Sequence, residues 1–169
     1  MTTYYVSSIL GSDNNAGTTA TAPLASLQAA ADLVHPGDTV LVMNGTNTNG
    51  GNDVLTISTS GTAGAPIIFE AAPGATPIID SSGAWQGIEI NASYITINGF
   101  TIVGDAANYT LAQALAGYGT GNSDLNGNGI GVALNDQSAN FHNIIIENNT
   151  IYNEPGAGIA TIGADIYKS

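Results

Sequence analysis

One short pattern recurs along this chain and limits what it can fold into. Each copy begins with a glycine followed by an isoleucine, and the copies are Gly87-Ile88-Glu89-Ile90, Gly129-Ile130-Gly131-Val132 and Gly158-Ile159-Ala160-Thr161. Residues 95–102 and 144–151 form a second matching pair, with apolar residues at the first, third and eighth places of both. Repeats separated by loops of variable length are typical of solenoids, because each coil packs only on its neighbours. The sequence therefore predicts an all-β fold, a parallel β-helix.

Short segments rich in Val and Ile alternate with turn clusters after residue 38, as the strands of such coils would. A β-sandwich is the competing architecture, since it also has many short strands. A sandwich does not require Asn98-Gly99 to recur as Asn148-Asn149 at the same place in a strand-turn-strand unit. In a β-helix, stacked Asn side chains can hydrogen-bond from coil to coil, and Asn tolerates a left-handed backbone. The predicted strands are 39–43, 54–57, 67–70, 77–80, 87–90 and 94–97.

The first 38 residues have a different pattern and are expected to cap the N-terminal end of the solenoid. Residues 4–8 have the composition of a short strand. An apolar stripe at helical spacing predicts an α-helix over residues 23–34, with Pro23 at its first position and Pro36-Gly37 beyond its end. The cap is therefore expected to be one strand and one helix.

The rest of the chain, residues 39–169, is expected to form the coils, so that residues 1–169 make a single domain. Residues 105–128 interrupt the coils as a long excursion between two strands, and a further helix is expected over residues 108–116. Long loops on a rigid scaffold commonly carry function, so the excursion is where we expect a site.

The charge of the chain argues against two classes of partner. It has one basic residue, Lys168, no Arg and 13 acidic residues, which give a formal net charge of -12. Nucleic-acid backbones are held mostly by Lys and Arg, so we expect no nucleic-acid binding, and anionic membrane surfaces are disfavoured for the same reason. No apolar run reaches the roughly 18 residues of a membrane-spanning helix, so we expect no membrane insertion.

The composition indicates an extracellular protein. Charged residues make up only 8% of the chain, which is unusual in the cytoplasm, and the absence of Cys means that regular packing must stabilise the fold. The N-terminal residues lack the basic start and apolar core of a signal peptide. We therefore expect that a leader has been removed, or that the sequence is a fragment of a longer parent chain with its own export signal.

Several segments carry a resemblance to a known family. They are Tyr4-Tyr5-Val6-Ser7-Ser8, Gly11-Ser12-Asp13, Pro23-Leu24 with Leu27-Gln28-Ala29-Ala30-Ala31, Pro36-Gly37-Asp38-Thr39-Val40, Gly64-Ala65-Pro66-Ile67-Ile68-Phe69 and Pro73-Gly74-Ala75-Thr76-Pro77-Ile78-Ile79-Asp80. Through these segments, essentially the whole chain resembles the N-terminal portion of bacterial right-handed parallel β-helix proteins of the pectate lyase-like polysaccharide lyase superfamily. This resemblance implies a right-handed solenoid with a capping strand and helix, and a secreted protein that acts on or binds polysaccharide.

The resemblance also implies a type of chemistry. Lyases of this family usually abstract a proton alpha to a uronate carboxylate with Lys or Arg, and calcium often neutralises that carboxylate. The family's catalytic residues lie on coils further along, and Lys168 is the single Lys or Arg of this chain. We therefore leave the catalytic residues unassigned and expect the catalytic coils outside this sequence.

A calcium site is predicted where the excursion ends. Asp124, Asn126 and Asn128 stand at the first, third and fifth places of an oxygen-ligand loop, and Gly129 stands at the sixth. The twelfth place lacks the usual Glu, so the neighbouring Asp136 is the expected closing ligand. Asp and Asn are also common turn residues in any β-solenoid, and that alternative stays open.

Aromatic side chains offer flat apolar faces for sugar rings, and we assign this role to Tyr109, Tyr118 and Trp85. The first two belong to the excursion, whereas Trp85 could equally cover the edge of a coil. Five carboxylates near predicted turns could converge in pairs on a cation, although turn and capping roles account for most of them. They are Asp13, Asp38, Asp53, Asp80 and Asp105.

Three functional hypotheses follow. The first is the N-terminal part of a polysaccharide lyase-like enzyme. The second is a structural or adhesive protein whose open β-helix ends stack into filaments or a surface layer, since unpaired strand edges invite association. The third is passive glycan binding through the excursion.

Overall fold

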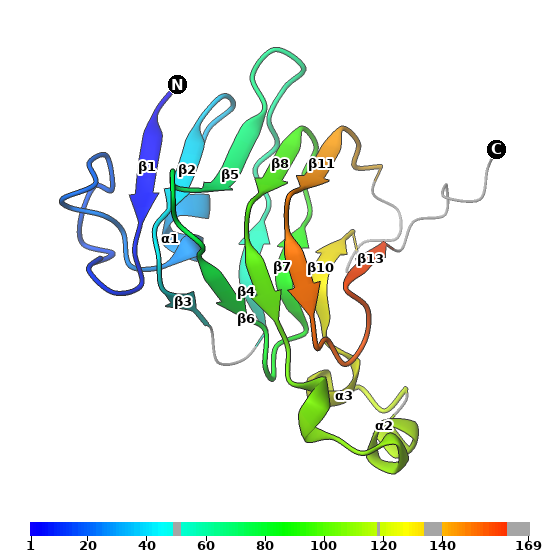
Figure 1. The fold of residues 1–169 in the computed structure, drawn as a ribbon. Coiled ribbons are helices and arrows are strands. Elements are labelled where there is room, and N and C mark those ends of the chain that lie inside the picture. Colours follow the sequence, from blue (N-terminus) through cyan, green and yellow to red (C-terminus); the bar gives the residue numbers. More distant parts are fainter. Residues whose placement is uncertain (49–51, 118, 134–139, 162–169) are drawn as a thin grey trace.

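The computed structural model describes residues 1–48, 52–117, 119–133 and 140–161. Its strands form three parallel sheets, which we number 1, 2 and 3 (Figure 1). Sheet 1 has the order β1-β2-β5-β8-β11, sheet 2 the order β3-β6-β9-β12 and sheet 3 the order β4-β7-β10-β13. From β2 onward the chain visits the sheets in the same order on every turn, so neighbouring strands come from successive coils.

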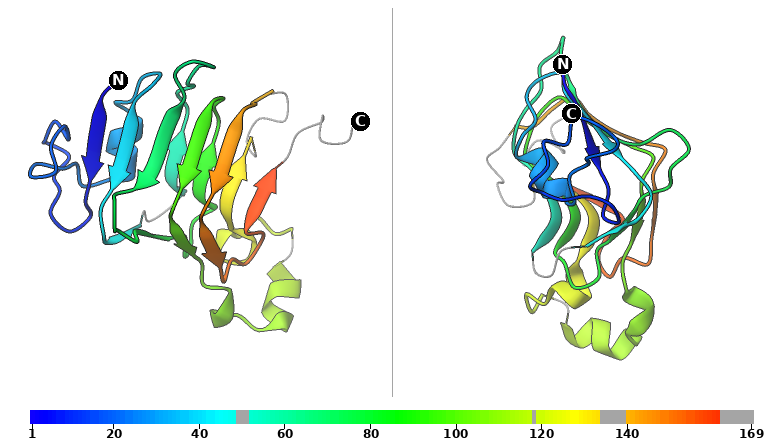
Figure 2. Two further views of the ribbon diagram at one scale, coloured as in Figure 1. Left: turned by 45° about the horizontal axis from the view of Figure 1, so that its top comes forward. Right: turned by 90° about the vertical axis from the view of Figure 1, so that its left-hand side faces the viewer.

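The strands are short, and the view along the solenoid in Figure 2 shows the three sheets surrounding one core. Sheet 1 contains β1 Thr3–Val6, β2 Thr39–Val42, β5 Ile67–Ala71, β8 Ile95–Asn98 and β11 Ile144–Glu147. Sheet 2 contains β3 Thr46–Asn47, β6 Ile78–Asp80, β9 Thr101–Val103 and β12 Thr150–Tyr152. Sheet 3 contains β4 Asp53–Ile57, β7 Gln86–Ile90, β10 Asn128–Val132 and β13 Ile159–Thr161.

Both sequence repeats lie in register. Ile95 pairs with Ile144 between β8 and β11, and in sheet 3 Ile88 pairs with Ile130, which pairs with Ile159. All pairs between the named strands are parallel. The predicted right-handed parallel β-helix is confirmed, and the β-sandwich alternative is wrong.

Columns of similar side chains fill the interior. Val40, Phe69 and Ile97 occupy one column of sheet 1, and each has 0% of its surface exposed. Full burial of one such side chain stabilises a protein by about 1.5–3 kcal/mol. The stacked columns therefore account for the stability of a chain that has no disulfide.

The recurring glycine has a packing reason. A Cβ at Gly87 would lie 2.7 Å from the carbonyl oxygen of Gly129 and 2.9 Å from Cγ2 of Ile102, a core residue of sheet 2. A Cβ at Gly129 would lie 2.5 Å from Cγ2 of Ile151. Glycine at these places lets the backbone of sheet 3 approach the isoleucines of sheet 2 closely.

The predicted stacking of Asn-rich turns is also confirmed. Asn148 Nδ2 donates to Asn98 Oδ1 of the preceding coil at 2.9 Å. Asn149 Oδ1 accepts a hydrogen bond from the backbone N–H of Phe100 at 2.9 Å. Asn148 has a φ of 56°, in the left-handed region that Asn tolerates. These side chains satisfy backbone and amide groups in the turns.

Strand β1 and helix α1 (Leu27–Ala31) form the N-terminal cap, and the helix predicted over residues 23–34 is too long at both ends. Ser26 is the N-cap, with its side chain accepting from the backbone N–H of Ala29. Before it, Asp13 Oδ1 accepts from the backbone N–H of Ser26, and Leu24 N–H donates to Tyr5 O. Residues 23–25 are therefore held by β1 and Asp13 and cannot join the helix.

The cap also supplies hydrogen-bond partners to the backbone of the outermost strand in two sheets, β4 of sheet 3 and β1 of sheet 1. Gln28 Oε1 accepts from Thr56 N–H at 2.9 Å, and Gln28 Nε2 donates to Thr56 O at 3.2 Å, so this side-chain amide replaces a neighbouring strand at the edge of sheet 3. On sheet 1, Tyr5 N–H donates to Gly17 O at 2.7 Å and Tyr5 O accepts from Leu24 N–H at 2.8 Å. Such pairing blocks the addition of another strand.

The excursion leaves the coils between β9 and β10. It contains the 3₁₀-helix η1 (Ala106–Asn108), helix α2 (Leu111–Gly117) and helix α3 (Ser123–Asn126). Figure 1 shows it projecting below the sheets. The helix expected over residues 108–116 corresponds to α2, which begins at Leu111. In the part of the chain that the structure describes, no helix is long and apolar enough to cross a bilayer.

The last described coil differs from the capped end. Strands β11, β12 and β13 each have one neighbouring strand, so the other edge of each lacks a strand partner among the described residues. Ile145, Tyr152 and Ile159 on these strands are about half exposed.

Candidate functional site

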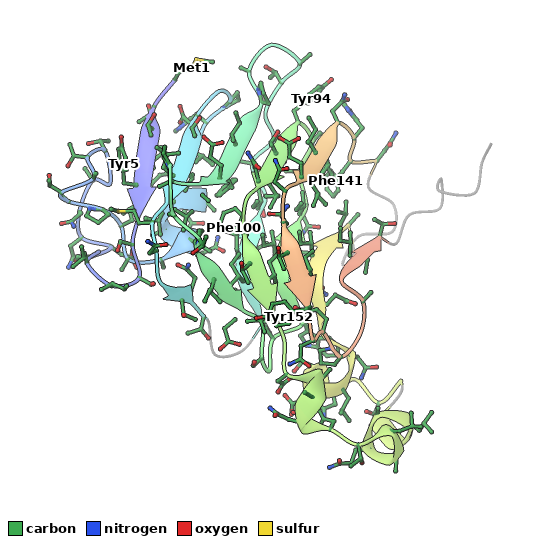
Figure 3. The ribbon with its side chains drawn as sticks, in the orientation of Figure 1. Met1, Tyr5, Tyr94, Phe100, Phe141 and Tyr152 are labelled. Atoms are coloured by element: carbon green, nitrogen blue, oxygen red, sulfur yellow. The ribbon has the colours of Figure 1, made fainter. Side chains whose placement is uncertain are left out.

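One corner of the solenoid, between sheets 2 and 3, gathers polar residues from three coils. In sheet 2, Asp80 pairs with Val103 and Val103 pairs with Tyr152, so the residues that follow these strands stack at the place where the excursion leaves. Figure 3 marks this place by Tyr152, just above the excursion. We call the site the acidic corner, and it consists of Asp80, Ser81, Asp105, Tyr109 and Glu154.

Glu154 reaches from its own coil past the next coil to a third. Its two carboxyl oxygens each lie 2.9 Å from Ser81 Oγ. The Glu154 side chain lies against Gly104 of the intervening coil, where a Cβ would lie 2.7 Å from Glu154 Oε2. Residue 104 must therefore lack a side chain for this contact to form.

The hydrogen bonds of Ser81 fit either protonation state of Glu154. Ser81 Oγ also lies 3.0 Å from the carbonyl oxygen of Val103, which accepts from the backbone N–H of Ser81 at 2.9 Å. Because Val103 O has this N–H as a donor, the Ser81 hydroxyl can donate its one hydrogen to an ionised Glu154. If Glu154 is protonated, its O–H can donate to Ser81 Oγ instead.

Burial and neighbouring charges favour the protonated form of Glu154. Burial raises the pKa of Glu154, and the charges of Asp105 and Asp80 raise it further, against the lowering effect of the Ser81 hydrogen bond. The result is a pKa of about 7, compared with an ordinary value of 4.5. Such a carboxyl group can both hold and release a proton near neutral pH.

Asp105 and Tyr109 form the outer part of the corner. The Tyr109 hydroxyl donates to Asp105 Oδ2 at 3.2 Å, whereas Asp105 Oδ1 is buried without a hydrogen-bond donor among the described residues. Desolvation and the charges of Asp105 and Asp124 raise the pKa of the Tyr109 hydroxyl. Negative charge thus accumulates here from three separate segments.

Two of the three predicted sugar-binding residues, Tyr109 and Trp85, lie among the described residues, in different surroundings. Tyr109 lines a mostly apolar pocket of about 110 Å³ beside the acidic corner, together with Leu111, Leu125 and Pro155. Trp85 lies in the connection between β6 and β7, partly buried, with its backbone bonded to Asn52 and Asn128. Tyr118 lies outside the described residues.

Three of the four predicted calcium ligands lie in helix α3 and at the start of β10. Asp124 is in the first turn of α3, and Asn126 Nδ2 donates to the carbonyl oxygens of Gly117 and Asn122. Asn128 Oδ1 accepts from Ala157 N–H. The closing ligand, Asp136, falls outside the described residues, and within those residues no three His, Cys, Asp or Glu side chains form a metal-binding group.

Sequence reasoning identified Asp80, Asp105 and Tyr109 but missed Glu154 and Ser81. The repeat contained a usable signal, because Ile79, Ile102 and Ile151 stack in sheet 2 and thereby align the residues that follow them. Extending that alignment by three residues from Ile151 reaches Glu154. The pairing of Glu154 with Ser81 skips a coil, so nearest-neighbour stacking alone does not predict it.

Comparison with solved structures supports the fold. Pectate lyase Pel9A matches with a TM-score of 0.66 and 22% identity over 94% of this chain and 35% of its own. A GH136 lacto-N-biosidase from Eubacterium ramulus has a TM-score of 0.64 and 22% identity, over 97% of this chain and 31% of its own. A rhamnogalacturonan lyase has a TM-score of 0.58 and 21% identity, over 78% of this chain and 33% of its own.

Sequence comparison gives a further relative. The lacto-N-biosidase of Bifidobacterium longum subsp. longum is 44% identical over 89 residues, which are 48% of this chain and 5% of that protein. The chain thus spans a small part of that relative and about a third of the solved ones.

The fold defines a right-handed parallel β-helix related to polysaccharide-acting enzymes. The family model described as "Pel9A-like, right handed beta helix region" matches residues 4–162. The chain therefore belongs to the Pel9A-like right-handed β-helix family.

Proposed function

We propose that this chain is the capped, N-terminal part of a secreted polysaccharide-active enzyme, and that the acidic corner with its excursion contacts the glycan. The observation that carries the proposal is the corner itself. Glu154, whose pKa is raised to about 7, lies beside Asp80 and Asp105, next to the pocket lined by Tyr109. Family membership supports polysaccharide as the ligand class.

Elimination is the first reaction class proposed, as the likeness to pectate and rhamnogalacturonan lyases suggests. It requires a base to remove the proton alpha to the uronate carboxylate. The single Lys, Lys168, lies outside the described residues, and the chain has no Arg. The base is therefore Lys168 or a residue of further coils, and calcium held near Asp124 would reduce the repulsion between an acidic glycan and this acidic chain.

Hydrolysis is a second candidate, and Glu154 favours it. Glycoside hydrolysis uses a protonated carboxyl group to donate to the leaving oxygen and a second carboxylate on the other side of the bond. With a pKa of about 7, Glu154 can supply such a proton, and Asp105 and Asp80 are acidic neighbours. The likeness to lacto-N-biosidases is consistent with this alternative.

The test uses the purified chain with polygalacturonate, rhamnogalacturonan and lacto-N-oligosaccharides, with calcium or with a chelator. Because the catalytic coils are proposed to lie elsewhere, binding measured by calorimetry is the required result. Tyr109→Ala should weaken binding about tenfold, a typical loss for a central contact, whereas Tyr5→Ala, on the outer face of sheet 1, should not. Absence of binding to every glycan would contradict the proposal.

Products distinguish the two reactions if cleavage occurs. Unsaturated uronides, detected by their ultraviolet absorbance and dependent on calcium, identify elimination. New reducing ends without that absorbance identify hydrolysis, and Glu154→Gln should then abolish them.

End-to-end association is the alternative function, and the last described coil favours it. Within the described ranges, strands β11, β12 and β13 each present an edge without a strand partner, and Ile145 and Ile159 are about half exposed. Sedimentation velocity over increasing concentration should show larger species, and Ile145→Lys should remove them. A monomer at every concentration would contradict this alternative.

A further inference from the structure

We propose that Asn44 is a site of self-modification, at which the folded chain converts the side-chain amide to a carboxylate with the backbone nitrogen of Gly45 as nucleophile. The reaction is deamidation through a cyclic imide, with water as co-reactant. This inference goes beyond the proposed function, because it concerns the turn between β2 and β3 and requires no glycan. It rests on the hydrogen bonds of the four Asn-Gly pairs that the structure describes.

The reaction needs a free nucleophile and a leaving group that can depart. The glycine N–H loses its proton to hydroxide, its nitrogen attacks the Asn side-chain carbon Cγ, and the bond from Cγ to Nδ2 breaks. Nδ2 takes a proton from water and leaves as ammonia, so that a succinimide remains. Water then opens this ring on either side and gives aspartate or isoaspartate, whose main chain is longer by a methylene group. Glycine favours the attack, because it has no Cβ to hinder the approach of its nitrogen.

Three of the four described Asn-Gly pairs have the nucleophile tied in a backbone hydrogen bond. The bonds run from Gly99 N–H to Glu147 O at 3.3 Å, from Gly127 N–H to Ser123 O at 2.8 Å and from Gly129 N–H to Ala157 O at 3.0 Å. A nitrogen held in this way must first leave its acceptor. This requirement lowers its reactivity about fivefold, the equilibrium weight of one ordinary hydrogen bond.

The same three pairs also have the leaving group tied. The contacts run from Asn98 Nδ2 to Glu70 Oε2 at 3.5 Å, from Asn126 Nδ2 to the carbonyl oxygens of Gly117 and Asn122, and from Asn128 Nδ2 to Gln86 Oε1 at 3.1 Å. Departure of ammonia would break these contacts at side chains that are partly buried. Folding therefore protects these three pairs at two of the reacting groups.

Asn44 differs from the three tied pairs at both groups. Among the described residues, neither Gly45 N–H nor Asn44 Nδ2 has a hydrogen-bond partner, and Asn44 is exposed to water and hydroxide. Asn44 Oδ1 accepts from the backbone N–H of Thr76 at 2.8 Å. That bond assists the reaction, because negative charge develops on Oδ1 when the nitrogen attacks and a fixed N–H donor stabilises it.

The turn fits an aspartate better than an isoaspartate. Met43 N–H donates to Val6 O at 2.9 Å, and Gly45 O accepts from Ile78 N–H at 2.9 Å, so the backbone is held on both sides of Asn44. Aspartate keeps the normal backbone length between these two bonds. Isoaspartate adds a methylene group between them and must displace one of them. The isoaspartate product should therefore loosen the contact between the first two coils.

Mass spectrometry of the full chain tests the inference. The chain is incubated at mildly alkaline pH, folded or in urea, and fragmentation spectra of its peptides distinguish Asn, Asp and isoaspartate at each pair. In the folded chain Asn44 should react at least about fivefold faster than Asn98, Asn126 or Asn128, the weight of the bond at the nucleophile alone. In urea, where these bonds are lost, the four rates should be alike. Asn49-Gly50, outside the described residues, is followed separately.

Variants identify the site and its effect. Asn44→Gln should stop the reaction at position 44, because Gln must close a larger ring, whereas the matched control Asn98→Gln should leave the rate at Asn44 unchanged. Asn44→Asp carries the charge of the product without the longer backbone and should melt near the wild type. The isoaspartate form, separated by chromatography, should melt at a lower temperature than Asn44→Asp.

Two results would overturn the inference. A folded chain in which Asn44 reacts no faster than the three tied pairs would remove the site. An isoaspartate form as stable as Asn44→Asp would remove its effect on the turn. Neither result depends on glycan binding, so the modification and the proposed function can fail separately.

Discussion

Sheet 1 and the acidic corner are built by the same stacking of successive coils, with opposite consequences. In sheet 1 the stacking places Val40, Phe69 and Ile97 on top of one another, and like on like gives dense apolar packing. At the corner it brings Asp80 and Asp105 beside Glu154, and like on like gives repulsion. Stacking of coils therefore brings similar side chains together, and this stabilises the fold when they are apolar and destabilises it when they carry the same charge.

The difference shows what holds each region. Packing in sheet 1 needs no particular pH, because its buried residues do not titrate. The corner contains a partly buried carboxyl group, Glu154, whose protonation depends on pH, and the charges of the corner oppose its own assembly. We therefore expect substitutions in sheet 1 to change stability at every pH. Substitutions in the acidic corner should change how stability depends on pH.

The largest expected effect on stability is in sheet 1. Phe69→Ala removes a fully buried ring from the middle of a column and should lower the free energy of unfolding by about 3–5 kcal/mol. The loss, measured by urea denaturation, should be the same at pH 5 and pH 8 within error. Leu10→Ala, at a side chain that is 73% exposed, is the control and should have little effect. A loss for Phe69→Ala no larger than the control's would contradict the column as the source of stability.

An intermediate effect is expected from Gly104→Ala. The new methyl group would meet Glu154 Oε2 and the carbonyl oxygen of Asn153, both at 2.7 Å, and overpacking of this kind costs about 1–3 kcal/mol. Gly64→Ala adds the same group where nothing lies within 4 Å and should be nearly neutral. Equal thermal stability of the two variants would show that the corner is not packed as described.

The smallest effect concerns pH. Because folding raises the pKa of Glu154 from 4.5 to about 7, its contribution to stability is fully present below about pH 4.5 and is lost as pH rises through about 7. Asp80→Asn removes one neighbouring charge, so this loss should be completed at a lower pH. Solvent screens the partly exposed site, so the change should be well below that of Phe69→Ala.

Thermal unfolding at a series of pH values measures that shift. Asn at position 80 can still accept the hydrogen bonds that Asp80 receives from Ser82, which limits other effects. Glu147→Gln, which removes a charge from the exposed face of β11, should leave the pH dependence unchanged. An identical pH profile for Asp80→Asn and the wild type would exclude Asp80 as a cause of the raised pKa.

The regular part of the fold could be predicted from sequence because its physical cause is periodic. Ile95 and Ile144 occupy the same place in their repeats, and burial fixes the register of such strands, so the pairing followed. The start of α1 could not be predicted in the same way. It depends on Asp13, whose long-range hydrogen bonds to residues 25 and 26 outweigh the helical pattern that begins at Pro23.

The candidate site was only partly predictable for a related reason. Asp80, Asp105 and Tyr109 could be identified by residue type and position in turns. The role of Glu154 depends on a contact across two coils and on the space left by Gly104, neither of which is visible in local sequence. Of the assigned sugar-binding and metal-binding residues that the structure describes, Tyr109 alone belongs to the acidic corner. The sugar and calcium assignments stay predictions.

Because Gln28 covers a sheet edge at the N-terminal end, the two ends of the solenoid differ in how they can associate. The Gln28 side-chain amide occupies the hydrogen-bonding edge of sheet 3 at one end of the molecule, while the edges of β11, β12 and β13 at the other end carry no such cover among the described residues. An open polymer needs two different complementary ends on each subunit, whereas one adhesive end can only meet its own copy. Association through these edges would therefore stop at a two-fold symmetric pair.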